Sequence, residues 1–241
     1  KGAVWCPGTG QAGFNGLGVI LSGEVNPSAK TSDTFVRDLT ATPTAQNFGN
    51  FTYDNMDEYK VTQTGFTGKE ETTTPSFINY VEGIYVGYRF YETAASEGLI
   101  DYDKTVLYPF GYGLTYGDVK VTAVAWTEKP EKDRPLKLRC TVNNTGMRDT
   151  DDVVQVYIKN ADSSLAVPNP ELAAFTPVFL KAGETKTVTL SIAPKSFTVV
   201  DETGARTEDG SHFHIYVGCT QPDERSVELT GVKPVEIEYS K

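Results

Sequence analysis

The sequence predicts a mainly β protein in which a β-sandwich follows a shorter region of mixed structure. After about Gly117, apolar and polar residues alternate in short runs separated by turn residues, which is typical of strands with one buried face. Before that point the chain offers one apolar run, one helix-like segment, a long polar stretch and a dense aromatic stretch. We therefore expect two regions of different fold class, residues 1–116 and residues 117–241.

The alternating pattern is clearest in three runs of the second region. In each of them every second residue is apolar, so one face of the strand is suited to a core. The apolar positions are Leu136, Leu138, Cys140 and Val142, then Val188, Leu190 and Ile192, then Phe213, Ile215, Val217 and Cys219. Roughly seven strands, separated by turn signals such as Ala182-Gly183 and Asp209-Gly210, predict an immunoglobulin-like or fibronectin type III β-sandwich.

The three cysteines, Cys6, Cys140 and Cys219, lie far apart and form no CxxC pair. Their spacing predicts neither a zinc site nor a disulfide framework. Because Cys140 and Cys219 fall on apolar faces, we interpret both as small core residues, and a bridge between them is the alternative.

The N-terminal segment has the pattern of a strand at residues 3–5, a glycine turn and a helix. Phe14, Leu17 and Leu21 recur at helical spacing, which predicts a helix over about residues 11–21. One strand with one helix cannot form a domain, because a buried parallel strand needs neighbours for its hydrogen bonds. We expect this segment to be the terminal strand-helix unit of an incomplete α/β sandwich domain.

Two stretches connect this unit to the β-sandwich. From about residue 30 to 80 the chain is polar and rich in Thr, Asn and Gly, which predicts long loops of the kind that border functional clefts. Residues 80–116 are crowded with Tyr and Phe. We interpret this crowding as a structural seam between domains, and a sugar-stacking platform is the alternative.

Two local motifs suggest chemistry that their surroundings do not support. Gly8, Gly10 and Gly13 match GxGxxG, but no second strand ending in an acidic residue follows, so we interpret them as turn and packing glycines. His212 and His214 share one face of a strand, and it is the outward one, so a metal site is not predicted.

Carboxylates are numerous, and glycoside hydrolysis needs two of them on either side of one bond. Asp149, Asp151 and Asp152 fall beside a predicted turn, while Glu70 and Glu71 fall in a polar loop. We interpret all five as solvated loop charges and nominate no catalytic residue.

Composition limits the partners and the cellular locations that we expect. The net charge of −10 and the pI near 4.8 disfavour nucleic acid as a partner. No run of 18 apolar residues is present, so we expect a soluble protein without a membrane partner. The chain starts at Lys1, directly in an apolar segment, so we expect its true N-terminus to lie elsewhere. Localisation stays open between a bacterial-type cytoplasm and secretion.

Several separated runs, in order, resemble family 3 glycoside hydrolases. The first, PGTGQAGFNGLGVILSGEVNPSAK, resembles the segment that closes the family's α/β sandwich domain, with Ala29 in place of a glycine. EGIYVGYRFYE and YPFGYGLTY resemble the stretches that lead into its fibronectin type III-like domain. NNTGMRDTDDVVQVYI and PNPELAAFTPVFLKAGETKTVTLSI resemble that domain itself.

The resemblance implies a non-catalytic portion of a retaining β-glucosidase-like enzyme that removes terminal β-linked sugars from oligosaccharides. The family takes an Asp nucleophile from a barrel domain and an acid/base from the α/β sandwich domain, and neither maps onto this chain. The implied partners are the missing barrel, the remainder of the sandwich domain and a β-glucoside or related oligosaccharide; homo-oligomerisation stays open. No cofactor or metal is implied, and the chain alone is expected to be inactive.

Phe48 and Tyr53 are the candidates for substrate binding, as sugar-stacking rings in the polar stretch. The alternative function is a stand-alone β-sandwich module that binds carbohydrate or protein. The N-terminal strand-helix unit distinguishes the two hypotheses, because a binding module has no need of it.

Overall fold

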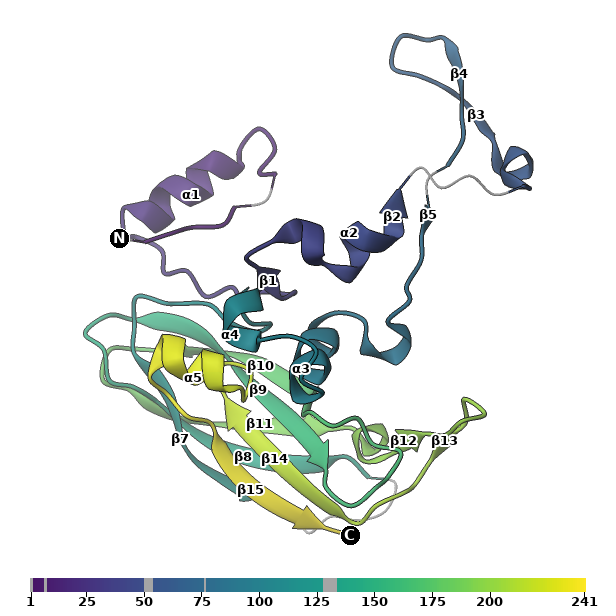
Figure 1. Ribbon diagram of the computed structural model, residues 1–241. Coiled ribbons are helices and arrows are strands. Elements are labelled where there is room, and N and C mark those ends of the chain that lie inside the picture. The colour runs from purple at the N-terminus through teal and green to yellow at the C-terminus, as the bar shows by residue number, and fades with distance from the viewer. Residues whose placement is uncertain (1, 7, 50–53, 76, 128–133) are drawn as a thin grey trace. The chain divides into compact units, whose positions relative to one another are not determined.

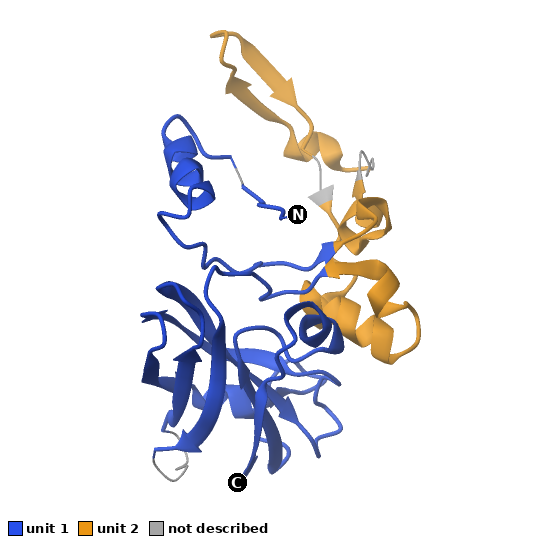
Figure 2. Ribbon diagram, turned by 90° about the vertical axis from the view of Figure 1, so that its left-hand side faces the viewer, with its two compact units in different colours: residues 1–35, 108–241 blue, residues 36–107 orange. Residues whose placement is uncertain are grey.

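The computed structural model divides into two compact units. It describes residues 2–6, 8–49, 54–75, 77–127 and 134–241. Unit 1 is made of residues 1–35 and 108–241, and unit 2 is made of residues 36–107. Figure 2 colours the two units separately.

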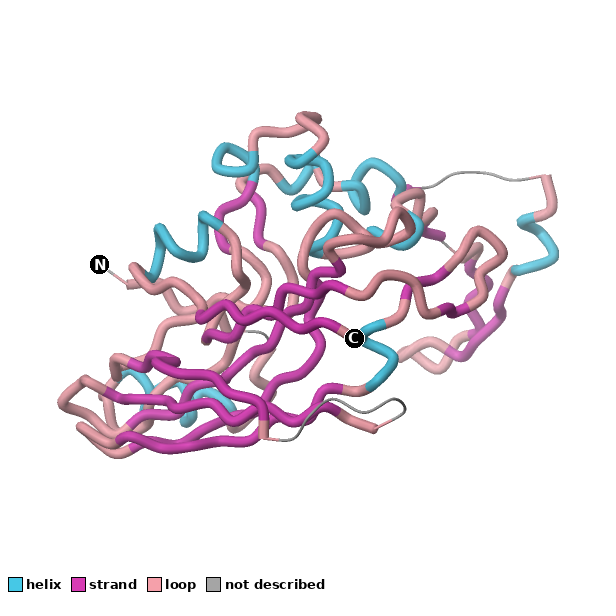
Figure 3. Tube along the Cα trace, turned by 90° about the horizontal axis from the view of Figure 1, so that it is seen from below, coloured by secondary structure: helices cyan, strands magenta, loops and turns pink. Residues whose placement is uncertain are grey.

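Unit 1 contains a β-sandwich of two antiparallel sheets (Figures 1 and 3). The four-stranded sheet has the order β10-β9-β14-β15 and the three-stranded sheet the order β11-β8-β7. The strands are β7 Val119–Trp126, β8 Leu136–Asn144, β9 Thr150–Asn160, β10 Glu171–Leu180, β11 Thr185–Ile192, β14 His212–Gly218 and β15 Val235–Ser240. The predicted mainly β fold and the expected number of sandwich strands are confirmed.

The core of the sandwich is formed by the alternate residues that the pattern singled out. On β8, Leu138 and Cys140 are fully buried while Lys137 and Arg139 between and beside them are exposed. The buried core residues from the other strands include Val154, Val156, Ile158, Leu180, Leu190, Ile192, Phe213, Ile215 and Val217. Phe197, in the short helix η4 (Pro194–Phe197), closes one side and makes an edge-to-face contact with Phe213.

The interpretation of Cys140 as a small core residue and the predicted glycine turns are also confirmed. All three cysteines are free, and Cys140 lies in the sandwich core, where burial raises the pKa of its thiol to about 11. Gly183 and Gly210 adopt φ of 71° and 86°, the left-handed region that a tight turn requires and that glycine accepts without a steric penalty.

A short helix, α5 (Glu224–Thr230), lies between β14 and β15 and was not predicted. Asp223 caps its start by accepting a hydrogen bond from the Ser226 amide at 2.9 Å, and Gly231 ends it with φ of 70°. Asp before the helix and Gly after it are the usual boundary signals. The minor strands β12 (Val199–Val200) and β13 (Arg206–Thr207) pair with each other.

The N-terminal segment corrects one expectation. Residues 3–5, predicted as a strand, form none, because no described strand lies beside them to complete their hydrogen bonds. The predicted helix forms as α1 (Gly13–Leu21), two residues later than expected, and none of its residues is buried. Phe14 and Leu21 are 68% and 64% exposed, so α1 has an unpartnered apolar surface in this chain.

Unit 2 contains more regular structure than the predicted long loops. Its elements are β1 Phe35–Val36, η1 Leu39–Ala41, α2 Pro43–Asn47, β2 Phe48–Gly49, η2 Met56–Tyr59, β3 Val61–Thr64, β4 Glu70–Thr73, β5 Phe77–Ile78, η3 Gly83–Tyr85, α3 Tyr88–Ser96, α4 Tyr102–Thr105 and β6 Val106–Tyr108, with β1 and β6 extending by one residue into unit 1. Its small core holds Val36, Tyr91 and Val106. Tyr91 belongs to the aromatic stretch, which supports the structural interpretation of that part of it.

The sequence did not predict the hairpin β3–β4, because its strands have no alternating apolar face. Every residue of both strands is exposed, and Thr62 and Thr72 hydrogen-bond across it at 2.8 Å through their hydroxyl groups. The turn is closed by Gly65 and by Gly68, whose φ is 75°. The β-branched threonines on either side of two glycines were the available signal.

No helix in the described part of the chain is long and apolar enough to cross a membrane.

A large-to-small substitution in the core tests the assignment of the strand faces. We expect Leu138→Ala to lower the free energy of unfolding by about 2–5 kcal/mol, because it removes fully buried methyl groups from a packed core. Arg139→Ala, at the exposed neighbouring position on the same strand, is the control and should change it by about 0.5 kcal/mol or less. Urea denaturation, followed by the fluorescence of the core-packed Trp126, measures both. Equal effects would contradict the assigned strand faces.

Candidate functional site

Unit 1 contains a seam where three distant segments of the chain meet. Residues 23–31, which follow α1 and are here called the strap, lie against residues 108–117 and against the start of β9. All three segments belong to the runs that carry the family resemblance. The seam is therefore the physical meeting point of those motifs.

Lys30 and Asp152 form a buried ion pair at the centre of the seam. The Lys30 Nζ lies 2.6 Å from the Asp152 Oδ1 and donates to the Gly113 carbonyl at 2.9 Å. The two side chains are 10% and 6% exposed. Burial raises the pKa of Asp152, and the Lys30 ammonium opposes this rise. Asp152 was predicted as a solvated loop charge, and this is wrong: it lies in β9, paired with a lysine from a segment 122 positions away.

Glycines allow residues 108–117 to approach the strap and the sheet closely. A Cβ atom at Gly111 would overlap the side-chain oxygen of Gln155, and one at Gly113 would overlap the main-chain oxygen of Ala29. Gln155, on β9, donates to the Gly111 carbonyl at 3.0 Å and accepts a hydrogen bond from the Tyr157 hydroxyl at 2.7 Å. Both side chains are at most 2% exposed, so this network is sealed from water.

Backbone hydrogen bonds join the two chain segments directly. The Thr31 amide donates to the Tyr112 carbonyl at 2.7 Å, and the Gly111 amide donates to the Thr31 carbonyl at 2.8 Å. The Thr31 hydroxyl donates to the Pro109 carbonyl and accepts from the Tyr112 amide. Tyr112 also stacks on Tyr108, with ring centres 5.3 Å apart. Tyr108 and Tyr112 thus have a structural role, as we interpreted the aromatic stretch.

Asn26 fixes the other end of the strap. Its Oδ1 accepts a hydrogen bond from the Tyr116 amide at 2.6 Å, and its Nδ2 donates to the Asp151 carbonyl at 3.2 Å. The Tyr116 hydroxyl donates to the Ile20 carbonyl at 2.8 Å, at the end of α1. One side chain thereby joins the strap, the aromatic stretch and β9, which explains why the NPSAK motif begins with Asn.

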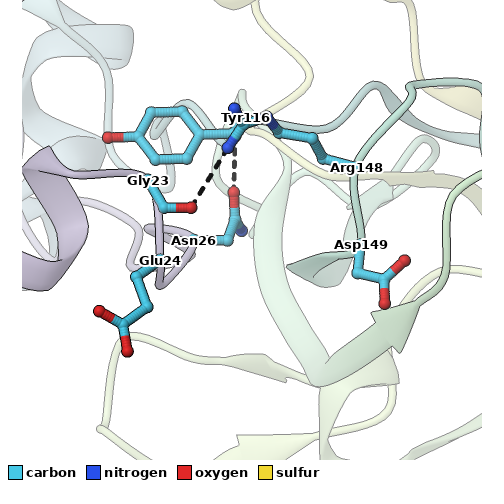
Figure 4. A pocket seen from close by; sticks show the side chains of 6 residues that line it. All are labelled: Gly23, Glu24, Asn26, Tyr116, Arg148 and Asp149. Carbon is cyan, nitrogen blue, oxygen red and sulfur yellow. Dashed lines mark hydrogen bonds between the residues drawn. The ribbon is translucent and has the colours of Figure 1, made fainter.

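A shallow surface pocket of about 210 Å³ lies beside Asn26 (Figure 4). It is lined by Gly23, Glu24, Asn26, Tyr116, Arg148 and Asp149. Arg148 donates to the Gly23 carbonyl at 3.2 Å, and Asp149 accepts from the Ala182 amide at 2.9 Å. Figure 4 shows the carboxylates of Glu24 and Asp149 directed away from each other. The pocket therefore lacks a converging pair of carboxylates of the kind that glycoside hydrolysis uses.

The other sequence motifs do not form sites. The His214 Nδ1 lies 2.8 Å from the Glu236 Oε1 on the outward face of β14 and β15, as expected for a surface position. Within the described residues, no group of three His, Cys, Asp or Glu side chains is arranged to hold a metal. Gly10 adopts φ of 63° in the turn before α1, which agrees with its interpretation as a turn glycine.

The structure describes one of the two predicted sugar-stacking residues. Phe48 lies in β2, which pairs with β5, and is 53% exposed in unit 2. Tyr53 lies outside the described residues. Sequence reasoning missed Lys30, Gln155 and Tyr157, because their importance depends on contacts between segments far apart in the sequence.

Substitution of the buried lysine tests the contribution of the ion pair to folding. We expect Lys30→Met to lower the free energy of unfolding by about 3–5 kcal/mol near neutral pH, because it leaves a buried carboxylate uncompensated. Lys120→Met, which removes the half-exposed pair with Asp118, is the control and should cost about 1 kcal/mol or less. A second control, Lys30→Met combined with Asp152→Leu, should recover most of the loss.

The same variant should have a defined pH dependence. Because its pKa is raised, the Asp152 carboxyl favours the neutral acid in the folded state. This contribution to the free energy of unfolding is fully present below the ordinary pKa of 3.8. It is lost as the pH rises through the pKa of Asp152 in the folded state. Without Lys30 the pKa of Asp152 rises further. The deficit of Lys30→Met relative to the wild type should therefore shrink as the pH falls, in urea titrations between neutral pH and pH 4. A constant deficit would contradict the pairing.

Close packing at the seam can be tested without changing charge. We expect Gly113→Ala to displace the strap, because the added methyl group would overlap the Ala29 carbonyl. Gly16→Ala in α1 is the control, because its added methyl group meets nothing within 4 Å, and it should leave the fold unchanged or slightly more stable. Limited proteolysis of the strap should be faster in Gly113→Ala alone; equal rates would contradict the described contact.

Comparisons with known proteins identify the relatives of this chain. The fibronectin type III-like domain family matches residues 152–221. An exo-α-(1→6)-L-arabinopyranosidase of Bifidobacterium breve is 33% identical over 193 residues, which are 80% of this chain and 21% of that protein. Thermostable β-glucosidase B of Acetivibrio thermocellus is 32% identical over 189 residues, which are 78% of this chain and 21% of that protein. The chain spans about a fifth of the length of these curated relatives.

Solved structures extend the likeness to nearly the whole chain. A GH3 β-glucosidase of Bifidobacterium adolescentis is 27% identical and covers 95% of this chain, which spans 28% of it, with a TM-score of 0.68. β-Glucosidase 3B of Thermotoga neapolitana, solved in complex with glucose, is 25% identical with the same TM-score; the match covers 95% of this chain and 27% of that one. The resemblance found in the motifs is thereby confirmed: the chain belongs with the family 3 glycoside hydrolases and carries their fibronectin type III-like domain.

Proposed function

We propose that this chain scaffolds the active site of a retaining, β-glucosidase-like glycosidase and supplies neither of its catalytic carboxylates. The observation that carries the proposal is the seam. Its buried ion pair, its glycine contacts and its Asn26 hydrogen bonds all serve to hold the strap on the β-sandwich. Such features fix one segment against another and leave no converging pair of carboxylates in the pocket beside them.

The exposed surface of α1 favours this scaffold over a stand-alone binding module. None of the nine residues of α1 is buried, and Trp5, just before it, is 71% exposed. A short helix gains most of its stability from packing its apolar face, so α1 in isolation lacks that stabilisation. We infer that the remainder of an α/β sandwich domain covers it, and that the predicted boundary between residues 116 and 117 separates that domain from the fibronectin type III-like one.

The substrate is inferred to be a terminal β-glucoside or a related sugar. Two of the relatives are named for β-glucoside and α-L-arabinopyranoside cleavage, and they are similar over about four fifths of this chain. Phe48 and Tyr53 are proposed to border the sugar subsite, with an exposed Phe48 ring available for stacking. The missing barrel and the rest of the sandwich domain are the proposed partners, in one polypeptide or as a second fragment.

Hydrolysis assays test this function. The chain is assayed alone on p-nitrophenyl β-glucoside, β-xyloside and α-L-arabinopyranoside, and again after mixing with a polypeptide that carries the barrel and the rest of the sandwich domain. We expect turnover only in the mixture, because the nucleophile and the acid/base reside in the second polypeptide. Turnover by the chain alone would refute the scaffold assignment. Equal activity of the second polypeptide with and without the chain would also refute it.

A further inference from the structure

The β-sandwich carries an apolar stripe on its outer surface that the seam does not use. Phe175, Pro177 and Phe179, here called the β10 stripe, follow one another at every second position of β10. Phe175 is 66% exposed and Phe179 is 45% exposed, and Pro177 between them is also exposed. Three consecutive outward positions in a strand would ordinarily be polar on a surface that only meets water.

The direction of the stripe follows from the residues between its members. Val178 and Leu180 are 4% and 0% exposed and belong to the sandwich core, so the alternate residues point to the outer face. The irregularity between Leu172 and Ala174 precedes the stripe, and the pairing from Ala174 to Leu180 with β9 is regular. The outward set is therefore continuous on one face of the four-stranded sheet.

The stripe lies next to the part of β9 that residues 108–117 cover. Phe175 pairs across the ladder with Gln155, whose side chain holds the Gly111 turn. Directly opposed side chains in an antiparallel pair lie about 4.5–5.5 Å apart at Cβ. The seam thus covers the outer face of β9 at Gln155 and Tyr157, and the exposed apolar surface continues from there onto β10.

We propose that the β10 stripe is a docking surface for the part of the parent glycosidase that lies outside this chain. This rests on the proposed function and specifies which face of the sandwich the missing polypeptide covers. The size of what is missing supports that occupant, because the chain spans only about a fifth of the curated relatives. Apolar aromatic residues that become desolvated at the centre of an interface supply most of its affinity.

Two features argue against other occupants. β10 is an edge strand, and Pro177 within it lacks an amide hydrogen, which makes that edge a poor template for an added strand. The partner therefore binds through side chains on the face. A second copy of the chain would bring together two molecules with a net charge of −10 each, which disfavours self-association.

Binding measurements with matched variants test the proposal. The double variant Phe175→Ser/Phe179→Ser is compared with the wild type for affinity to the polypeptide that carries the barrel and the rest of the sandwich domain. Val200→Ser is the control, because Val200 is a 44% exposed apolar residue on β12. We expect the double variant to bind at least about tenfold more weakly and the control to bind as the wild type does. Urea midpoints of all three should agree, since the substituted side chains are exposed.

The outcomes separate this inference from the proposed function. If the wild-type chain does not bind the second polypeptide at all, the proposed function fails, and the docking surface fails with it. If the wild type binds and restores turnover but the double variant does so equally well, only the docking surface is refuted. Sedimentation of the chain alone completes the test: self-association abolished by the double variant would identify a second copy as the occupant and overturn the proposal.

Discussion

The charge balance between Lys30 and Asp152 is the constraint on which the arrangement of unit 1 depends. Neither group reaches water freely, so neither can be removed without leaving the other buried and uncompensated. The lysine comes from the strap and the carboxylate from β9, and the same ammonium also holds the Gly113 carbonyl. The ion pair can therefore form only when the strap, residues 108–117 and the β-sandwich are all in place. Its main effect is to select this arrangement of the three segments, and its net contribution to stability is secondary.

The family motifs become understandable as parts of this one arrangement. Asn26 opens the strap because an amide can both accept from the Tyr116 amide and donate to the Asp151 carbonyl. Glycine occurs at 111 and 113 because a Cβ there would overlap neighbouring oxygens. These motifs therefore encode how the strap and residues 108–117 attach to the β-sandwich, while α1 and the β10 stripe remain exposed.

The sandwich could be predicted from sequence because its signal is local. Alternation along β8 identifies the buried residues without any knowledge of the partner strand. Asp152 could not be assigned correctly in this way, since its burial depends on Lys30, and no periodicity links the two. The hairpin β3–β4 escaped because its strands are exposed on both faces, while α5 was missed although Asp223 and Gly231 mark its ends. The pocket beside Asn26 is likewise formed by segments that only the fold brings together.

The hydrogen bonds between Thr31 and the Gly111-Tyr112 pair have an evolutionary consequence. They pin the chain on either side of residues 36–107, so the ends of that whole insertion are held together by unit 1 whatever lies between them. Once a loop is closed, doubling its length adds only about 0.6 kcal/mol of closure entropy. Residues 36–107 can therefore lengthen, shorten or acquire new elements such as the β3–β4 hairpin at little cost to the stability of the sandwich.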